Sequence, residues 1–260
     1  MGLAERLREP GLIGVDVDSI DRIAAHREII ARKPMIRDVF GEIHRLMLEL
    51  EGRYLPAQGV RVEIGAGVWP VRETDPDVLA TDIVAAPHLD RVLDAQAMDF
   101  ADGSVRSVFG QHCFHHLPDP ERFFSELIRV CPPGGGAILV EPYWSPVASF
   151  VFKRLFTTED FIKSADWTTA GTGAMSGANQ ALSYIVFKRD RERFHRLFPY
   201  LEVVHQAPLG NYARYLISGG LNFRQLLPDA LSPFLKGAEM MLTPLNRVLA
   251  LHHVLVLRRR

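Results

Sequence analysis

Val62-Glu63-Ile64-Gly65-Ala66-Gly67 is a short apolar run that ends in an acid and two glycines one residue apart. Glycine accepts positive φ and lets a ligand approach the main chain, so a strand followed by Gly-x-Gly predicts a tight turn built around a ligand. Many strand-to-helix turns carry glycine, and the motif alone is therefore weak. The segments that follow it indicate that the ligand is a nucleoside cofactor.

Two further short strands also end in acids. Residues 78–82 form the first, and its Asp82 lies seventeen residues after Gly65. An acid at the tip of the second strand of an open parallel sheet can accept hydrogen bonds from both ribose hydroxyls, although a cap or turn aspartate is the alternative. Residues 91–94 form the second and end in Asp94. Together with Glu63, three strand tips therefore present carboxylates.

A helix separates the next two predicted strands, residues 105–110 and 137–141. Pro118-Asp119-Pro120 opens this helix, and Pro132-Pro133-Gly134-Gly135-Gly136 ends it, because proline removes donors and glycine permits the reversal. Apolar residues recur within it at helical spacing: Phe123, Phe124, Leu127, Ile128 and Cys131. The alternation of strands and helix predicts an α/β fold.

In this order the motifs resemble those of the class I S-adenosylmethionine (SAM) dependent methyltransferases, in particular the branch of the ubiquinone and menaquinone methyltransferases. The motifs are Glu63-x-Gly65-x-Gly67, Asp82, Asp94-Ala95, the segment 100–104, His115-His116-Leu117-Pro118-Asp119-Pro120 and Pro133-Gly134-Gly135, within roughly residues 60–145. The resemblance implies a SAM-dependent methyltransferase. Its fold would be a Rossmann-like, mostly parallel seven-stranded sheet with helices on both faces.

The resemblance also implies which residues contact SAM. Those assigned to the methionine part are Glu63, Gly65, Ala66, Gly67, Gly110 and Gln111, and those assigned to the nucleoside are Asp82, Ile83, Asp94 and Ala95. Asp82 would hold the ribose hydroxyls and Ile83 would pack on the adenine. Asp94 would accept a hydrogen bond from the adenine amino group, and the main-chain amide of Ala95 would meet a ring nitrogen.

The sequence departs from the family where a third glycine is usual, because Trp69 stands there and Pro70 follows. Pro70 and Pro76 interrupt residues 68–77, and an interior proline costs about 3 kcal/mol, so the first crossover helix should shrink to about one turn. A dinucleotide site would need glycine at position 70 and a helix N-terminus behind the turn. Trp69 is expected either to pack on the sheet or to wall the pocket and face the sulfonium.

Composition excludes several classes of function. The chain has 260 residues, 47% hydrophobic content and a formal charge of −1, which gives no reason to invoke a nucleic acid partner. Its two cysteines, Cys113 and Cys131, lack CxxC spacing, which indicates a reducing compartment and argues against a thiolate metal site. No apolar run is long enough to span a membrane and the N-terminus carries charges, so we expect a cytoplasmic protein. The sequence leaves open whether it is a monomer or a homodimer.

The segments outside the motifs predict the domain organisation. Residues 1–56 are expected to form an N-terminal helical cap, with two helices divided by Pro34; their apolar stripe is either core or ligand contact. Residues 57–260 would be the SAM-binding domain, with insertions at about 142–183 and 211–251. The first insertion contains the glycine-rich residues 171–180 and is the candidate lid. A helix over 184–198 should precede the last strands, 201–205 and 253–257.

The second insertion is expected to be a helical cover over an apolar acceptor. It contains Tyr212 and an apolar run from 234 to 251 that Pro244 interrupts. A membrane-surface helix beside the terminal Arg258-Arg259-Arg260 is the alternative to a solvated basic tail, so peripheral membrane contact stays open. The candidate substrate-binding residues are Tyr143, Trp144, Asn179 and Tyr212.

The candidate general bases are His112, His115, His116 and Glu141, because they follow the fourth and fifth strands, where ligands bind in such sheets. In relatives the His115-His116 pair occurs with unlike acceptors, which favours a structural or cofactor-shaping role. No metal site is predicted, since the histidines lack a partner set at ligand spacing.

These features together predict methyl transfer from SAM to a small, largely apolar molecule, with oxygen preferred over nitrogen or carbon as the acceptor. Two alternatives remain. The scaffold could retain SAM while catalysing a cyclisation or rearrangement, or it could be a non-catalytic binding module whose altered glycine turn no longer accepts SAM. The product mass separates methyl transfer from rearrangement.

Overall fold

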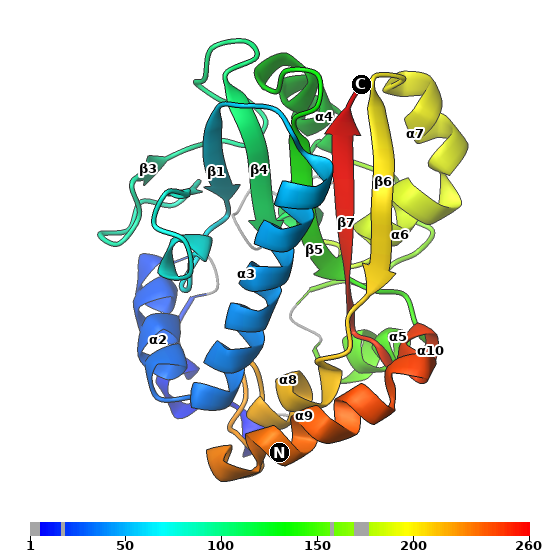
Figure 1. Cartoon of the computed structure of the whole chain (residues 1–260). Coiled ribbons are helices and arrows are strands. Elements are labelled where there is room, and N and C mark those ends of the chain that lie inside the picture. The colour runs from blue at the N-terminus through cyan, green and yellow to red at the C-terminus, as the bar shows by residue number, and fades with distance from the viewer. Residues whose placement is uncertain (1–5, 17–18, 157–158, 169–176) are drawn as a thin grey trace.

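The computed structural model describes residues 6–16, 19–156, 159–168 and 177–260. Over these residues a seven-stranded sheet of order β3-β2-β1-β4-β5-β7-β6 runs through the molecule (Figure 1). The strands are β1 (Val60–Ile64), β2 (Leu79–Asp82), β3 (Arg91–Val92), β4 (Val105–Gln111), β5 (Gly136–Pro142), β6 (Leu201–Pro208) and β7 (His252–Arg259). The predicted α/β fold and its strands are confirmed.

The sheet is parallel except at β7, which lies antiparallel between β5 and β6. Parallel pairing of β1 with both β2 and β4 sets Glu63 opposite Ala80 on one side and Phe109 on the other. On the outer side of β2, Asp82 pairs with Val92 of β3. The carboxyl ends of these strands therefore meet at one edge of the sheet, which brings the acids predicted from the sequence together.

One face of the sheet is covered by α4 (Pro120–Val130). Asp119 caps this helix by accepting hydrogen bonds from the amides of Glu121 and Arg122, and Pro120 occupies its first turn. Both features favour a helix start. The buried side of α4 presents Phe123 and Phe124 to an aromatic cluster that also contains Phe114, Phe187, Phe194 and Phe198.

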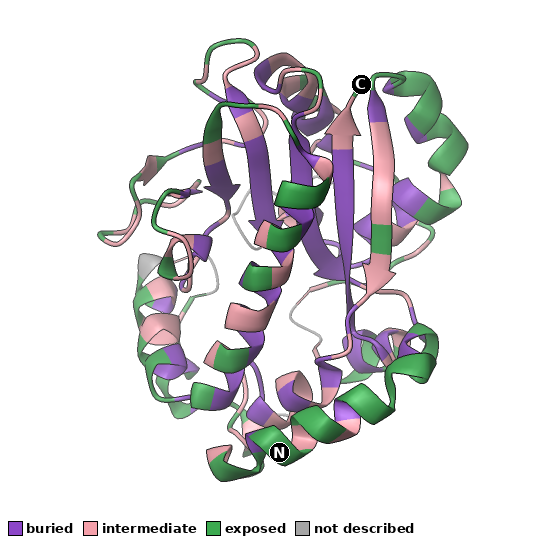
Figure 2. Cartoon of the chain, in the orientation of Figure 1, coloured by how far each residue is buried: buried purple, intermediate pink, exposed green. Residues whose placement is uncertain are grey.

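The other face is covered by α3 (Pro34–Tyr54), which α2 (Ile20–Ala31) precedes. Pro34 stands in the first turn of α3, where it costs no hydrogen bond, and it separates the two helices as predicted. Figure 2 shows the buried stripe of α3 facing the strands. Residues of this stripe that pack with β4, β5 and β7 include Ile36, Val39, Phe40, Ile43, Met47 and Leu50.

The first crossover is a single 3-10 turn, η2 (Val71–Glu73). Pro70 precedes this turn, and the amide of Val71 donates to Glu63 Oε2 at 2.7 Å. The predicted loss of the usual helix is thus confirmed, because the prolines leave room for only one turn. The carboxyl of Glu63 receives a main-chain donor from the segment that replaces the helix.

The remaining helices belong to the N-terminal segment, the β4 tip and the two insertions. They are η1 (Pro10–Leu12), η3 (Phe114–His116), α5 (Pro146–Arg154), α6 (Leu182–Tyr184), η4 (Ile185–Arg189), α7 (Arg191–Leu197), α8 (Tyr212–Ser218), η5 (Asp229–Leu231), α9 (Ser232–Met241), η6 (Thr243–Leu245) and α10 (Asn246–Leu249). Residues 169–176, the centre of the candidate lid, lie outside the described part of the chain. No helix in the described ranges combines the length and the apolar character that crossing a membrane requires.

The single helix predicted over 184–198 is wrong in detail. A π-helix, η4, is followed by a separate α7, and the two meet at Asp190. The carboxylate of Asp190 accepts a hydrogen bond from the indole of the buried Trp167 at 2.9 Å and pairs with Arg189. This long-range contact, which no local pattern encodes, accompanies the interruption.

Candidate active site

A cavity of about 700 Å³ opens at the carboxyl edge of the sheet. Four strand-end segments line it, and α2, α5 and α8 contribute the opposite walls. The strand-end residues that line the cavity are Glu63, Ile64, Gly65, Ala66, Gly67, Val68, Trp69, Asp82, Ile83, Val84, Leu93, Asp94, Ala95, Gln96, Gln111, His112 and Cys113. The position is the one where open α/β sheets bind ligands.

The glycine turn after β1 requires both of its glycines, for different reasons. Gly65 has φ +58°, and a Cβ there would lie 2.4 Å from the sulfur of Cys113. Gly67 has φ +53°, but a Cβ there would meet only the carbonyl oxygen of Gly65, at 3.7 Å. Position 65 is therefore closed by the protein itself, whereas position 67 borders open space in the cavity.

Asp82 closes this turn from the tip of β2. Its Oδ2 accepts a hydrogen bond from the amide of Gly67 at 3.0 Å, and its Oδ1 accepts one from Val84 at 3.0 Å. Each carboxylate oxygen has a second lone pair, so Asp82, which also lines the cavity, can still accept from a ligand hydroxyl. The amide of Ala66 is likewise used inside the protein, since it donates to the carbonyl of Thr81 at 2.9 Å.

Glu63 lies behind the turn and is 2% exposed. Burial, together with the charge of Asp82, raises the pKa of Glu63 to about 8. At neutral pH the carboxyl is therefore mostly protonated, and a cation brought into the cavity beside it would favour the charged form.

The nucleoside residues implied by the resemblance lie along one wall. Ile83 is 53% exposed and presents an apolar surface to the cavity. Asp94 Oδ1 accepts a hydrogen bond from the amide of Gln96 at 2.8 Å, and Ala95 is buried beside it. Trp69 packs against the core under α3 and also lines the cavity, while its contact with the sulfonium stays a prediction.

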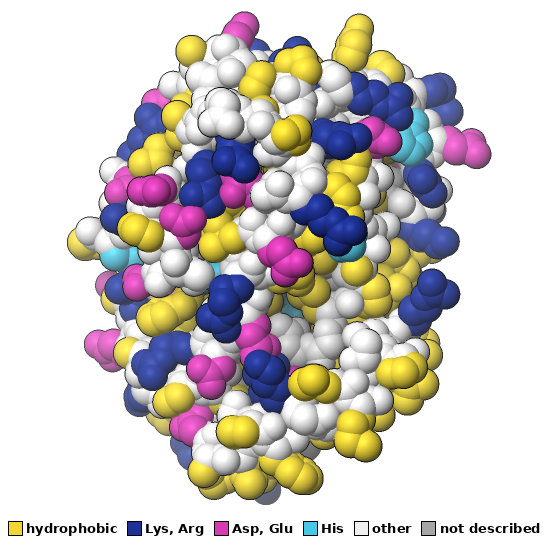
Figure 3. All heavy atoms as spheres, viewed as in Figure 1, with side chains coloured by type: hydrophobic (Ala, Val, Ile, Leu, Met, Phe, Trp, Pro, Cys, Tyr) yellow, Lys and Arg dark blue, Asp and Glu magenta, His cyan; other side chains and the backbone are white. Residues whose placement is uncertain are grey.

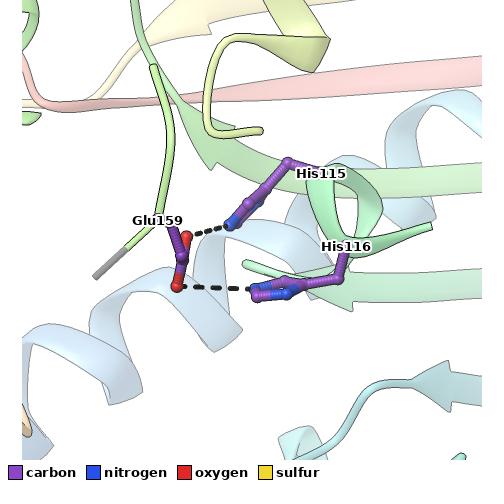
Figure 4. Close-up of side chains that lie close together, drawn as sticks. All are labelled: His115, His116 and Glu159. Carbon is purple, nitrogen blue, oxygen red and sulfur yellow. Dashed lines mark hydrogen bonds and ion pairs between the residues drawn. The ribbon is translucent and has the colours of Figure 1, made fainter. Parts of the chain in front are cut away.

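A buried charge cluster forms the opposite side of the site (Figure 4). His115 Nδ1 lies 2.6 Å from Glu141 Oε2, and its Nε2 lies 3.1 Å from Glu159 Oε2. Burial alone would lower the pKa of His115, but the two carboxylates outweigh it and raise the pKa to about 10. Burial would raise the pKa of Glu159, but the hydrogen bond and the charge of His115 outweigh burial and lower this pKa to about 2. His115 is thus an imidazolium that donates from both nitrogens.

Glu141 is fully buried and does not line the cavity. Its Oε1 accepts the amides of Cys113 and Phe114 at 3.1 and 2.9 Å, while Oε2 holds His115. These donors keep the pKa of Glu141 below its usual range despite complete burial. The arrangement makes Glu141 the anchor of the β4 end and leaves it poorly placed to take a proton from a ligand.

The ligand atoms of His115, His116 and Glu159 lie within 4.8 Å of one another, which is close enough to hold a metal ion. Both nitrogens of His115 already face carboxylates, so a metal would have to displace the proton between His115 and Glu159. His116 Nε2 lies 3.8 Å from Glu159 Oε1. The expectation of no metal site remains a prediction.

A second group of rings, His112, Tyr215 and His252, lines the cavity above β4. His112 has φ +55° and is the non-glycine residue with positive φ in the described chain. The ring centroids of His112 and His252 are 4.4 Å apart, and His112 stacks on Tyr215 at 6.3 Å. Nε2 of both histidines is buried without a hydrogen-bond partner in the protein. Burial lowers the pKa of His112 to about 4 and that of His252 well below its usual value.

The structure places some predicted site residues away from the cavity lining. Gly110 is packed between Ile64 and Leu139, and a Cβ there would lie 3.0 Å from Leu139. The amide of Asn179 is occupied by both main-chain groups of Ile162. Tyr143, Trp144 and Tyr212 also lie outside the lining. The substrate contacts of Tyr143, Trp144, Asn179 and Tyr212 stay predictions.

Several lining residues were not predicted. Glu159 and Phe156 come from the first insertion, His252 from the start of β7, and Arg22 and His26 from α2. Two predictions pointed to these segments without naming the residues: the apolar stripe of the N-terminal helices and the candidate lid in the first insertion. Glu159 follows no strand and belongs to no motif, so nothing in the sequence connects it to His115.

Known proteins match parts of this chain. A family model described as "Methyltransferase domain" matches residues 72–139. The chloroplastic tocopherol O-methyltransferase of Arabidopsis thaliana is 34% identical over 89 residues, which are 34% of this chain. The aligned segment spans 26% of that relative, about a quarter of its length.

Two solved structures share the fold. Geranyl diphosphate C-methyltransferase from Streptomyces coelicolor A3(2), in complex with Mg²⁺, geranyl diphosphate and S-adenosyl-L-homocysteine, has a TM-score of 0.51 at 13% identity, over 97% of this chain and 87% of that one. A geranyl diphosphate methyltransferase in complex with SAM has a TM-score of 0.53 at 14% identity, over 98% and 96%. At such identities the likeness establishes the architecture alone.

Proposed function

Because this chain belongs to the class I SAM-dependent methyltransferases, we propose that it transfers a methyl group from SAM to a small, largely apolar molecule. We further propose that oxygen is the preferred acceptor atom. The observation that carries the proposal is the cavity of about 700 Å³ between the glycine turn and the histidine clusters. The likeness to the ubiquinone and menaquinone branch remains a prediction.

The residues present fit SAM by their chemistry. Gly67 borders open space that a side chain would fill, and Glu63 is a buried carboxyl that an ammonium group would return to its charged form. We assign Gly65 and Gly67 to the methionine part and Asp82 to the ribose hydroxyls. Ile83 and the Asp94 segment would hold the adenine. Bound SAM would supply an activated methyl group, so the protein has mainly to align an acceptor and exclude water.

The acceptor half of the cavity has an apolar wall with a few unpaired polar atoms. Phe152, Phe156 and Leu221 supply apolar surface. His112 Nε2 and His116 Nδ1 are buried atoms without a partner in the protein, and burial lowers the pKa of both rings to about 4. Both are therefore neutral at pH 7. A hydroxyl on the ligand would satisfy such a nitrogen, which supports oxygen as the acceptor and makes these two atoms our candidates to receive its proton.

The binding part is tested by calorimetric titration of the purified chain with S-adenosylhomocysteine. We expect dissociation constants below the millimolar range for the wild type and at least tenfold weaker binding for Asp82→Ala, because its carboxylate holds the turn and faces the cavity. Asp82→Asn separates size from charge, and the exposed Asp77→Asn serves as the matched control. Normal binding by Asp82→Ala would refute the assigned ribose contact.

The reaction is tested by incubating the wild type with methyl-labelled SAM and a metabolite extract, followed by mass analysis of the labelled product. Methyl transfer adds one methyl group. A product of unchanged mass would favour a rearrangement enzyme, and tight SAM binding without any product would favour a binding module.

A further inference from the structure

Helix α9 buries polar residues and exposes apolar ones, which is the reverse of a usual amphipathic helix. Its buried residues are the polar Ser232 and Glu239, while Phe234 is 76% exposed and Met241 is 83% exposed. A helix of a water-exposed surface normally buries its apolar residues. The run predicted to cover an acceptor therefore presents its largest side chains to the outside.

The inner side of α9 is fixed by charges. Arg214 of α8 is 3% exposed and donates from its main-chain N and its Nε to Glu239, at 2.8 and 2.7 Å. Its other guanidinium nitrogens donate to Glu42 of α3. Because this buried pairing holds Glu239 inward, α9 cannot roll its apolar side toward the core without leaving charges unpaired.

The exposed apolar side chains continue on both sides of α9. Figure 3 shows them as a yellow group over the end of the molecule that α9 forms. We call this surface the apolar end face; its residues are Leu226, Leu227, Leu231, Phe234, Met240, Met241, Leu242, Leu245 and Val248, each at least 38% exposed. Phe150 of α5, which packs against α10, and Leu155, directly after α5, extend it. Contiguous exposure of this kind marks an interaction site.

The charges on this surface have one sign. Residues 226–249 contain two acids, and both are turned inward: Glu239 pairs with Arg214, and Asp229 accepts the amide of Met35. The basic residues that accompany the face are Lys153, Arg154, Lys236 and Arg247, all exposed. Lys236 also pairs with Glu42. The face thus combines large apolar side chains with positive charge.

We propose that the apolar end face docks this protein on an anionic lipid surface, with the apolar side chains entering the interface and the basic residues facing lipid headgroups. Apolar residues flanked by Lys and Arg are the pattern by which helices lie in a membrane interface. A symmetric pair of copies fits less well, because a two-fold axis would set the same basic residues of each copy against one another. Arg258, Arg259 and Arg260 take no part, since the C-terminus lies at the opposite end of the molecule (Figure 1).

The face also borders the wall of the cavity. Tyr215 of α8 and Phe152 of α5 line the cavity, and α8 packs on α9 while α5 packs on α10. Docking through this end would bring the acceptor side of the cavity close to the lipid. Lipid docking itself does not depend on the proposed reaction.

The test is co-sedimentation of the full chain with vesicles of phosphatidylcholine, with and without phosphatidylglycerol. We expect binding to the mixed vesicles, at least tenfold weaker binding without the anionic lipid, and weakening by salt. Phe234→Ser/Met241→Ser should weaken binding tenfold or more. The matched control is Leu197→Ser/Tyr200→Ser, which removes apolar side chains of 47% and 62% exposure elsewhere on the surface.

As a control, both double variants are titrated with S-adenosylhomocysteine. We expect wild-type affinity, which would show that the variants are folded and that lipid docking is independent of cofactor binding. Wild-type protein that stays in the supernatant with mixed vesicles at low salt would overturn the proposal. Equal binding by Phe234→Ser/Met241→Ser would overturn it as well. A dimer detected by light scattering without lipid, and abolished by Phe234→Ser/Met241→Ser, would show instead that the face joins two copies.

Discussion

Gly65 and Gly67 share a left-handed backbone, yet they differ in what surrounds them, and this difference separates folding from ligand binding. Gly65→Ala combines a strained φ with a Cβ 2.4 Å from Cys113 Sγ, so we expect it to lower the free energy of unfolding by about 2–4 kcal/mol. Gly67→Ala has no such contact and should cost only about 1–2 kcal/mol, from backbone strain. Urea denaturation followed by circular dichroism measures both.

Gly67→Ala should affect ligand binding more strongly than it affects the free energy of unfolding. The methyl group at position 67 projects into the space where the cofactor is proposed to lie, so Gly67→Ala should bind S-adenosylhomocysteine at least tenfold more weakly while remaining folded. If Gly67→Ala binds like the wild type, the glycine turn does not contact the cofactor and its glycines serve the backbone alone.

His115 provides a residue-scale prediction about charge. With its pKa raised to about 10, it should remain protonated through the neutral range, and its ring signals in an NMR titration should not move between pH 6 and 8. The stability that the cluster contributes is fully present below the ordinary pKa of 6.5 and is lost as the pH rises toward 10. Glu159→Gln removes one of the two negative charges beside the ring and should lower the pKa of His115. Titration of His115 near 6.5 in the wild type would contradict the ion cluster.

The sequence could anticipate the residues of the site that follow strands, and it missed those brought there by insertions. Gly65 and His115 come after β1 and β4, Asp82 ends β2, and parallel pairing places the carboxyl ends of these three strands at one edge. Glu159 lies 44 residues after His115, beyond the end of α5 and outside any helix or strand. Such contacts depend on tertiary packing, which local spacing does not encode.

At the scale of single elements, the start of α4 rests on one side chain. Asp119 Oδ1 accepts the amides of Glu121 and Arg122, and Asp119→Ala would leave these donors to water. We expect Asp119→Ala to lower the free energy of unfolding by about 1 kcal/mol. Asp119→Asn retains an acceptor and should lose less. The thermal midpoints of the three proteins check this order, and equal midpoints would show that Pro120 alone fixes the helix start.

Elements were predictable where local chemistry and burial agree. Strands such as β5 are largely apolar runs bounded by proline or glycine. The prolines after β1 correctly predicted a single turn in place of the first crossover helix. The pattern failed at Asp190, where a bond to Trp167 accompanies a break in the helix, and at α9, whose apolar residues face outward. In both cases a long-range polar contact decided the outcome.

At the scale of the whole molecule, buried neutral histidines should make the fold acid-sensitive. Burial lowers to about 4 the pKa of five histidines in the described chain: His26, His44, His112, His116 and His253. The unfolded chain protonates these rings near pH 6.5, so between pH 6.5 and about 4 the folded state binds fewer protons. Each such proton lowers the free energy of unfolding by roughly 1.4 kcal/mol per pH unit. The contribution is present above pH 6.5 and is lost as the pH falls.

Glu63 and His115 act in the opposite direction, because both bind protons more tightly in the folded state. Because its pKa is raised to about 8, Glu63 binds one extra proton in the folded state between pH 4.5 and 6.5. This proton cancels the effect of about one of the five histidines, so acid still favours the unfolded state. We therefore expect the urea midpoint to fall steeply from pH 7 to pH 5. His44→Gln removes one titrating ring distant from the charge cluster, so the urea midpoint of this variant should depend less on pH. Glu63→Gln removes the opposing group, so its urea midpoint should depend more steeply on pH. A urea midpoint that stays constant from pH 7 to pH 5 would mean that these rings are hydrated and titrate as they do in the unfolded chain.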